Sequence, residues 1–353
     1  MPEIVLILLM NMNNIIQPYA LGKIFWAGVI GSIQRKFKIN KNQLIPLIVG
    51  DYRFVSLIKK VGPKKSYRLA LYKNNNGEKA FAKLRSSMIK DYHYYSLLNE
   101  IAVNKILTQV YDRIKRTLPN KYLHIRFPRF LYACEANGWL VELMEYVTAK
   151  DTNNFRDEQK VTTFVLVSDF LGYLGKHFTI EERKQISRRT TLNLISLYPF
   201  ILLKTLINYP YLVIKIIKAT VLFISSIPDL KKTRQEQLIH RDLHFFNILQ
   251  DKKTLVVIDL QQCVFGEVLQ EYVTTLRYFW GEGRFYKLFF QETLKRFENR
   301  KNYIKILRGL MINSVIHGLT DKSFSKKAIS NWFDYLDFAI NPNFKLYENK
   351  GHK

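Results

Sequence analysis

Cysteine is scarce in this sequence of 353 residues, which contains only Cys134 and Cys263. The two cysteines have no metal-ligand spacing and are too few for a disulfide framework. This usage is typical of a protein from a reducing compartment. We expect both side chains to act as small apolar residues.

Acidic residues are also few, because 29 Asp and Glu stand against 55 Lys and Arg, for a net charge of +26. Such an excess indicates anionic partners: a nucleotide, a phosphorylated substrate, nucleic acid or an acidic membrane surface. Zinc-ligand spacings, RNA-binding signatures and a basic helix-turn-helix are absent from the sequence, which argues against nucleic acid.

Long uncharged apolar runs are missing as well, as is a basic segment of the kind that precedes the apolar part of a signal peptide. Residues 4–10 are apolar, but Glu3 precedes them and the run is too short to span a bilayer, so we expect no signal peptide. Internal repeats and low-complexity tracts are absent. The remaining composition, with 48% hydrophobic and 14% aromatic residues, is enough for a sizeable core.

Two segments raise the question of a membrane. Residues 191–228 are strongly apolar and are interrupted by lysines and three prolines, which predicts broken helices that either build an acceptor pocket or touch a membrane. Residues 21–39 mix aromatic, apolar and basic side chains. They are either an interfacial helix on an anionic membrane or a helical extension packed on the main domain.

The most informative stretch is 238–259. It reads as a turn, a short apolar strand, a polar turn at 250–254 and a second apolar strand, which is a β-hairpin pattern. Asp242, Asn247 and Asp259 then stand at strand ends. Phosphoryl transfer from ATP needs such a set, because one carboxylate takes the proton of the attacking hydroxyl while an amide oxygen and a second carboxylate hold Mg²⁺.

These residues resemble the catalytic loop and metal-binding strand of the protein-kinase-like superfamily. The tripeptides 242–244 (Asp-Leu-His) and 247–249 (Asn-Ile-Leu) are most similar to its small-molecule branch: aminoglycoside phosphotransferases, choline kinases and sugar kinases of the lipopolysaccharide core. The tripeptide 240–242 (His-Arg-Asp) is the sequence more usual in protein kinases. Leu260 and Gln261 follow Asp259 where protein kinases have Phe-Gly.

The resemblance implies an α+β, bilobal protein-kinase-like fold. We expect a helical N-terminal extension at 1–50 and a small antiparallel-sheet lobe at 51–147 that binds the nucleotide. A mainly helical lobe at 148–353 would carry the catalytic loop and the acceptor site.

The expected small lobe contains strands at 54–61, 67–72 and 80–84, followed by a helix at about 92–107. Lys83 lies inside an apolar strand, where a lysine needs a partner, and Glu100 lies on the helix. The resemblance pairs them, with Lys83 reaching the α- and β-phosphates. It also places Gly62 in a phosphate-covering loop, although an ordinary hairpin explains this turn equally well.

Two further strands are expected at 130–133 and 139–144. The segment that follows resembles the hinge of the superfamily, in which main-chain groups near Glu145 and Val147 would bond adenine.

The resemblance assigns the remaining roles residue by residue. Asp242 is the expected catalytic base, and Asn247 and Asp259 are the expected Mg²⁺ ligands. His240 would hold the loop through a backbone hydrogen bond, and Arg241 would have a structural or substrate-phosphate role.

The resemblance also bears on two further positions. Glu271, five residues after Gly266, stands where the branch usually has an Asp that braces the loop. His244 is open between packing and the metal shell.

An Ala-Pro-Glu segment is missing after Asp259, which counts against a protein kinase. The sequence therefore predicts an ATP- and Mg²⁺-dependent phosphotransferase acting on a hydroxyl of a small molecule or a lipid-linked sugar. A protein kinase and a catalytically inactive kinase-like binding protein are the alternatives. We expect a cytoplasmic enzyme, with peripheral contact at the inner face of an anionic membrane as an open alternative to a fully soluble one.

Overall fold

The computed structural model describes residues 44–61, 67–87, 92–232, 236–281, 283–320 and 326–341. The predictions for the segment 21–39 and for Gly62 lie outside these ranges. The chain divides into two compact units, which are treated separately. Unit 1 comprises 1–150, 177–188 and 249–263, and unit 2 comprises 151–176, 189–248 and 264–353.

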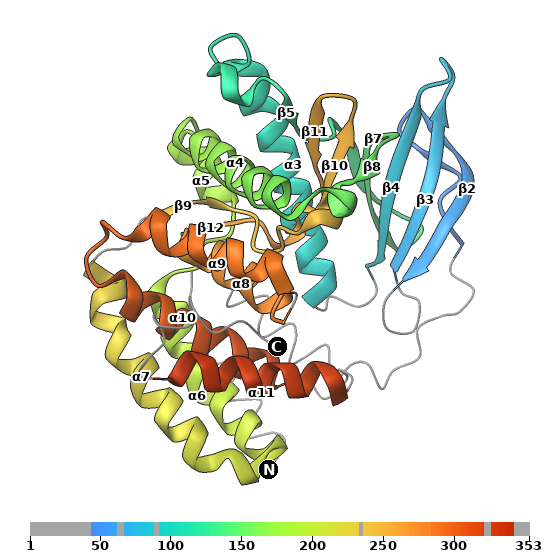
Figure 1. Cartoon of the computed structure of the whole chain (residues 1–353). Coiled ribbons are helices and arrows are strands. Elements are labelled where there is room, and N and C mark those ends of the chain that lie inside the picture. The colour runs from blue at the N-terminus through green and yellow to red at the C-terminus, as the bar shows by residue number, and fades with distance from the viewer. Residues whose placement is uncertain are drawn as a thin grey trace. The chain divides into compact units, whose positions relative to one another are not determined.

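Unit 1 is built on a six-stranded antiparallel sheet (Figure 1). In spatial order its strands are β1 (Ile48–Val49), β2 (Tyr52–Val61), β3 (Tyr67–Asn74), β4 (Lys79–Ser86), β7 (Trp139–Glu145) and β6 (Phe130–Ala136). The five strands that the sequence predicts in this region are all present. Each is observed with ends that differ from the prediction by a few residues at most.

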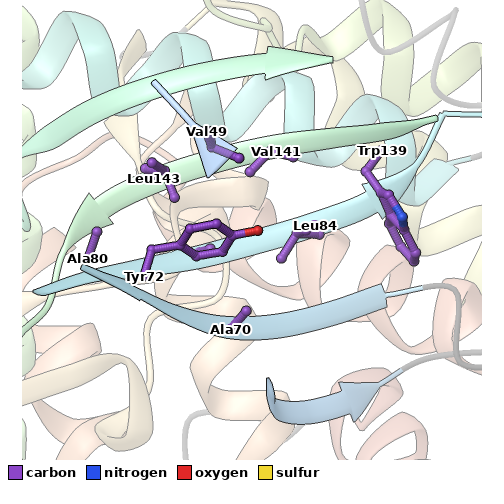
Figure 2. Packing of buried hydrophobic residues seen from close by; sticks show 9 residues of the cluster. Val49, Ala70, Tyr72, Ala80, Leu84, Trp139, Val141 and Leu143 are labelled. Carbon is purple, nitrogen blue, oxygen red and sulfur yellow. The ribbon is translucent and has the colours of Figure 1, made fainter. Parts of the chain in front are cut away.

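One face of this sheet is an apolar cluster, shown in Figure 2. Alternate residues of the adjacent strands β4 and β7 fill it: Ala80, Ala82, Leu84, Trp139, Val141 and Leu143. The segment before β1 covers this face, because the Tyr72 hydroxyl donates to the carbonyl of Pro46 at 2.7 Å and Trp139 Nε1 donates to that of Leu44 at 3.0 Å.

Helix α3 (Tyr92–Ile114) packs on the opposite face, where Tyr94 and Leu97 contact Leu140. Side chains alternate along a strand, so the other residues of β4 and β7 point to this side. Lys83 and Glu142 are cross-strand partners there. The side chains of Lys83 and Glu142 therefore lie on the face of the sheet that α3 covers.

A second sheet has the strand order β5 (Ile125–Arg126), β11 (Thr254–Val257), β10 (Ile248–Asp251) and β8 (Lys150–Asp151). Strands β10 and β11 form the predicted hairpin. The short helices η2 (Asn120–Tyr122), α5 (Ile180–Gln185) and η6 (Leu260–Gln262) also lie in unit 1. Helix α5 begins with a capping box between Thr179 and Glu182.

In unit 2 the chain enters through η3 (Thr152–Asn154) and α4 (Asp157–Lys176), and β9 (Glu236–Ile239) pairs antiparallel with β12 (Val264–Glu267). Helix α4 approaches β9 closely at two glycines. A Cβ on Gly172 would lie 2.5 Å from Gln237 Oε1, and one on Gly175 would lie 3.0 Å from Leu238 Cβ. This contact fixes the strand that leads into the loop at 240–247, in which η5 (Phe245–Asn247) lies.

The rest of unit 2 is helical. Helices α8 (Leu269–Tyr278), α9 (Gly283–Phe297), α10 (Tyr303–Gly318) and α11 (Lys326–Ile340) follow β12, and α10 packs against α6, α7, α8 and α11. The ring of Phe164 on α4 lies edge-on to those of Tyr272 and Phe289, with centroids 5.2 and 4.7 Å away. The resemblance had implied a mainly helical lobe in this part of the chain.

The apolar segment forms a helical hairpin of α6 (Thr191–Asn208) and α7 (Val213–Lys232), joined by η4 (Pro210–Leu212). The expectation of broken helices is confirmed by the interruption between α6 and α7, although only one of the three prolines lies at it. Pro199 and Pro228 lie inside helices, and only Pro210 marks a break. Within the described residues, the stretch Pro210–Lys231 is the one helix long and apolar enough to cross a membrane by length and composition, although the lysines had argued against any such helix.

Candidate active site

Lys83 holds two carboxylates of unit 1. Its Nζ lies 2.7 and 2.9 Å from the oxygens of Glu100 and 2.6 Å from Oδ1 of Asp259. The predicted ion pair between Lys83 and Glu100 is confirmed. The sequence had not predicted that the same ammonium also reaches Asp259, which is 176 positions away in the chain.

Helix α3 fixes the backbone that follows Asp259. Glu100 Oε1 accepts the N–H of Leu260 at 3.1 Å, and Asn99 Nδ2 donates to the carbonyls of Gln261 at 3.3 Å and Cys263 at 2.9 Å. Asp259 itself has a left-handed backbone with a φ of 63°. Non-glycine residues in this conformation concentrate at functional sites, because surrounding contacts must impose the strain.

The carboxyl of Glu100 is completely buried, and burial raises its pKa to about 7, against the opposing effect of the Lys83 ammonium. The negative charge of Asp259 adds to the rise. Two carboxylates that share one cation destabilise each other's charged form. Binding of a further cation, or protonation of one carboxylate, would therefore stabilise the cluster of Lys83, Glu100 and Asp259.

Sequence reasoning missed a third carboxyl on this side of the sheet. Glu142 is fully buried, its Oε1 accepts a hydrogen bond from Asn104 Nδ2 at 2.7 Å, and its Oε2 has no hydrogen-bond partner. Burial, and then the charge of Glu100, raises its pKa well above 4.5. The signal was available, because Glu142 is a charged residue inside an apolar strand, as Lys83 is.

In unit 2, the loop after β9 is braced by the residue that the sequence singled out. Glu271 Oε2 accepts the backbone N–H of Arg241 at 2.8 Å. Arg241 has a left-handed φ of 65°, and the next N–H, of Asp242, donates to Nδ1 of the buried His240 at 3.3 Å. These contacts confirm the predicted bracing role of Glu271 and the predicted backbone contact of His240.

The second half of the loop closes on itself. Asn247 Nδ2 donates to the backbone carbonyl of Asp242 at 2.9 Å and lies 3.2 Å from His244 Nε2. The amide nitrogen of Asn247 is a hydrogen-bond donor, and the amide oxygen is an acceptor. The oxygen is therefore the atom suited to a metal ion. His244 Nε2 is 4.0 Å from the Asp242 carboxylate, whose side chain keeps 23% of its surface exposed. A general base must reach the hydroxyl of its substrate, and a partly exposed carboxylate such as that of Asp242 can do so.

Two residues of α8 also contact the loop and were not predicted from the sequence. Thr275 Oγ1 donates to the carbonyl of Leu243 at 3.0 Å, and a hydrogen bond with Asp242 contributes to the raised pKa of the Tyr278 hydroxyl, in which burial is the larger cause. Only the packing of α8 brings them to the loop, so no local pattern in the sequence could identify them.

The predicted hinge follows β7. The backbone N–H of Glu145 donates to Arg129 O at 2.9 Å, and its carboxylate pairs with Arg126 at 2.7 Å. The amide of Glu145 is therefore engaged within unit 1. The adenine contact of the main chain near Glu145 and Val147 stays a prediction.

The sequence-predicted residues thus assemble in two groups. Lys83, Glu100 and Asp259 lie together in unit 1, and the loop residues His240, Arg241, Asp242 and Asn247 lie together in unit 2. Within the described part of the chain, three or more His, Cys, Asp or Glu side chains never cluster as a metal site would require. A magnesium ion needs only one or two protein carboxylates beside phosphate and water oxygens, so this finding is compatible with one.

Comparison with known proteins identifies the class. A sequence model described as the phosphotransferase enzyme family matches residues 108–301, more than half of the chain. The chain therefore belongs to the phosphotransferase enzyme family. No curated protein sequence matches it.

Solved structures share the fold. A thermostable mutant of aminoglycoside phosphotransferase APH(4)-Ia, in a ternary complex with ADP and hygromycin B, is 11% identical with a TM-score of 0.54, covering 86% of this chain and 95% of its own. An aminoglycoside phosphotransferase from Alicyclobacillus acidocaldarius subsp. acidocaldarius DSM 446 is 10% identical with a TM-score of 0.53, covering 89% and 100%.

The predicted α+β, bilobal protein-kinase-like fold is thus confirmed, as is membership in the small-molecule branch of that superfamily. The chain is a phosphotransferase.

Proposed function

We propose that this enzyme transfers the γ-phosphoryl group of ATP to a hydroxyl group with the help of Mg²⁺, and that Asp242 is the general base. The observation that carries the proposal is the loop of unit 2, in which Glu271, His240 and Asn247 all bond the backbone at 241–242. These bonds hold a partly exposed carboxylate in place without using its oxygens.

In the proposed reaction the acceptor oxygen forms a bond to the γ-phosphorus while the bond from phosphorus to the bridging oxygen breaks, releasing ADP. The hydroxyl proton passes to the carboxylate of Asp242. Lys83, held by Glu100, would bond the α- and β-phosphates. Asn247 through its amide oxygen and Asp259 through its carboxylate would hold the magnesium ion, which neutralises charge on the phosphates.

The nucleotide assignment rests on the Lys83 cluster and on the fold neighbour that was crystallised with ADP. Lys83 is nearly buried, yet it sits beside more negative charge than it can balance alone. The Mg²⁺ ion of a magnesium nucleotide would supply positive charge next to Asp259. The phosphates of the nucleotide would bind the Lys83 ammonium.

For the acceptor, the net charge of +26 favours an anionic molecule over a polycationic aminoglycoside. A phosphorylated or lipid-linked sugar fits this charge, and the latter would place the enzyme at the inner face of an anionic membrane, peripherally attached from the cytoplasm. A screen of neutral sugars, sugar phosphates, amino alcohols and aminoglycosides with γ-labelled ATP identifies the acceptor class.

The test of the mechanism is Asp242→Asn. Loss of a general base lowers turnover by about two to four orders of magnitude, while ATP affinity and thermal unfolding stay unchanged. Asp112→Asn, at an exposed aspartate of α3 that pairs with Lys115, is the matched control and keeps full turnover. Near-normal turnover in Asp242→Asn would remove Asp242 from this role.

A further inference from the structure

Helix α7 is apolar on both of its sides. Ile216, Ala219 and Phe223 are buried on the inner side, whereas Ile214 and Ile217 are 81% and 56% exposed. Val221 and Ile224, one and two turns further on, are exposed as well and complete the same outer stripe. A helix that is hydrophobic all round is expected in a protein core or against a membrane, and not on a water-exposed face.

Helix α6 also has exposed apolar residues. Phe200, Leu203 and Ile207 recur at spacings of three and four residues and are all exposed, and Tyr211 in the connection between the helices is 71% exposed. We call the exposed apolar side chains of residues 200–224 the outer face of the α6–α7 hairpin. Exposed apolar side chains that are concentrated in one part of a fold mark a binding site for a protein or a membrane.

The hairpin is fixed to the helices behind it. Thr205 Oγ1 donates to the carbonyl of Ile316 in α10 at 3.1 Å, and Lys215 pairs with Asp337 of α11 at 2.8 Å. A Cβ on Gly309 of α10 would lie 2.0 Å from Ser226 Oγ, so α7 and α10 are in close contact. Inserting α7 across a bilayer would expose this inner side, so the packing favours surface contact over spanning.

The charged residues of the hairpin itself are all lysines apart from one aspartate. Lys204 and Lys218 are exposed on the two helices, among five lysines in residues 191–232. The only acidic residue of that stretch, Asp229, pairs with Lys305 at 2.8 Å. Two copies of this face placed together would oppose their lysines. An anionic lipid surface complements both the charge and the apolar stripe.

We propose that the outer face of the α6–α7 hairpin docks onto an anionic phospholipid bilayer. The apolar stripe enters the boundary between headgroups and acyl chains, and Lys204 and Lys218 contact the phosphates. The inference rests on the proposed membrane site of action but not on phosphoryl transfer, because vesicle binding is measured without ATP or acceptor.

The first test is co-sedimentation at low salt with vesicles of phosphatidylglycerol and phosphatidylcholine, or of phosphatidylcholine alone. The protein should bind only the anionic vesicles. Replacing Ile214, Ile217 and Val221 together by Gln should weaken binding by at least about tenfold, because three apolar side chains no longer enter the interface. Lys204→Gln with Lys218→Gln should weaken it by about 30-fold and reduce its salt dependence.

Matched controls carry the same substitutions elsewhere. Ile48, Leu123 and Ile180 are exposed apolar residues of unit 1, and their combined replacement by Gln should leave vesicle binding unchanged. Lys105→Gln with Lys176→Gln, at exposed lysines of α3 and α4, should cost much less than the change at Lys204 and Lys218. Equal loss in both lysine pairs would show that total charge binds the vesicles, which overturns the docking face.

A second measurement does not depend on how well the triple variant folds. In a Cys134→Ser background, an environment-sensitive fluorophore on Ile217→Cys should shift to the blue when anionic vesicles are added, and one on Ile180→Cys should not. No binding at low salt, or no shift at residue 217, overturns the proposal. So does a wild-type dimer that the triple substitution converts to a monomer without changing vesicle binding, since the face would then join two copies.

Discussion

The Nζ of Lys83 lies 2.6 Å from Oδ1 of Asp259. This contact joins a residue of β4 to a residue that follows β11, and Glu100 completes the cluster from α3 at 2.7 Å. One ammonium therefore balances two carboxylates, one of which is fully buried. The same three side chains therefore contribute to the stability of unit 1 and to the proposed binding of a metal nucleotide.

Removing the cation should leave Glu100 buried without its partner. We expect Lys83→Met to lower the free energy of unfolding by about 3–5 kcal/mol, as for other broken buried ion pairs. Combining it with Glu100→Gln should recover part of the loss, because the unpaired charge is gone. Urea titrations measure both changes. Lys115→Met, which breaks an exposed pair with Asp112, should cost less than about 1 kcal/mol.

Asp259→Asn tests the metal assignment. Losing a carboxylate ligand should weaken MgATP binding by at least about tenfold, since even outer-shell changes have effects of that size. Binding of ATP in the presence of EDTA should change little. Calorimetry with Asp242→Asn as the comparison separates ligand from base, because that variant should keep its MgATP affinity. An unchanged MgATP affinity in Asp259→Asn would show that Asp259 does not hold the metal.

Glu271 should make stability depend on pH. Burial raises its pKa to about 7 from an ordinary value of 4.5. Between these values the folded protein holds a proton that the unfolded chain releases, so this stabilisation is fully present below 4.5 and is lost as the pH rises through 7. Glu271→Gln should flatten the profile between pH 4.5 and 7 by on the order of 1–3 kcal/mol.

Thermal unfolding across this pH range measures the effect of Glu271→Gln. Glu181→Gln, at an exposed glutamate of α5, is the control and should retain the wild-type profile. A profile as steep in Glu271→Gln as in the wild type would contradict the assignment of this pH dependence to Glu271.

Glu142 should tolerate loss of its charge but not of its shape. Burial raises its pKa well above 4.5, so the neutral carboxyl is favoured and Gln is a close substitute that still accepts from Asn104. We expect Glu142→Gln to change the free energy of unfolding by less than about 1 kcal/mol. Glu142→Ala should cost about 1–3 kcal/mol, because the Asn104 amide loses its acceptor. Equal losses in the two variants would show that the charged form matters.

Much of this molecule could be predicted because its signals are local. Strands β2, β3, β4 and β7 follow from apolar runs bounded by turn residues, and the hairpin of β10 and β11 follows from the spacing around Asp259. The pairing of Lys83 with Glu100 was predictable because a charge inside an apolar strand needs a partner. The bracing by Glu271 came from its position in a motif.

Other features depend on which surfaces meet, and the tertiary structure alone determined them. Asn104 supports Glu142, and Thr275 supports the loop, because α3 and α8 bring distant segments together. The apolar segment 191–228 shows the difference most clearly, since its composition predicts a buried hairpin and a membrane surface equally well. Packing against α10 uses only one side of α7. The sequence therefore determined that this hairpin is apolar, but only the structure showed that Ile214, Ile217, Val221 and Ile224 point to the outside.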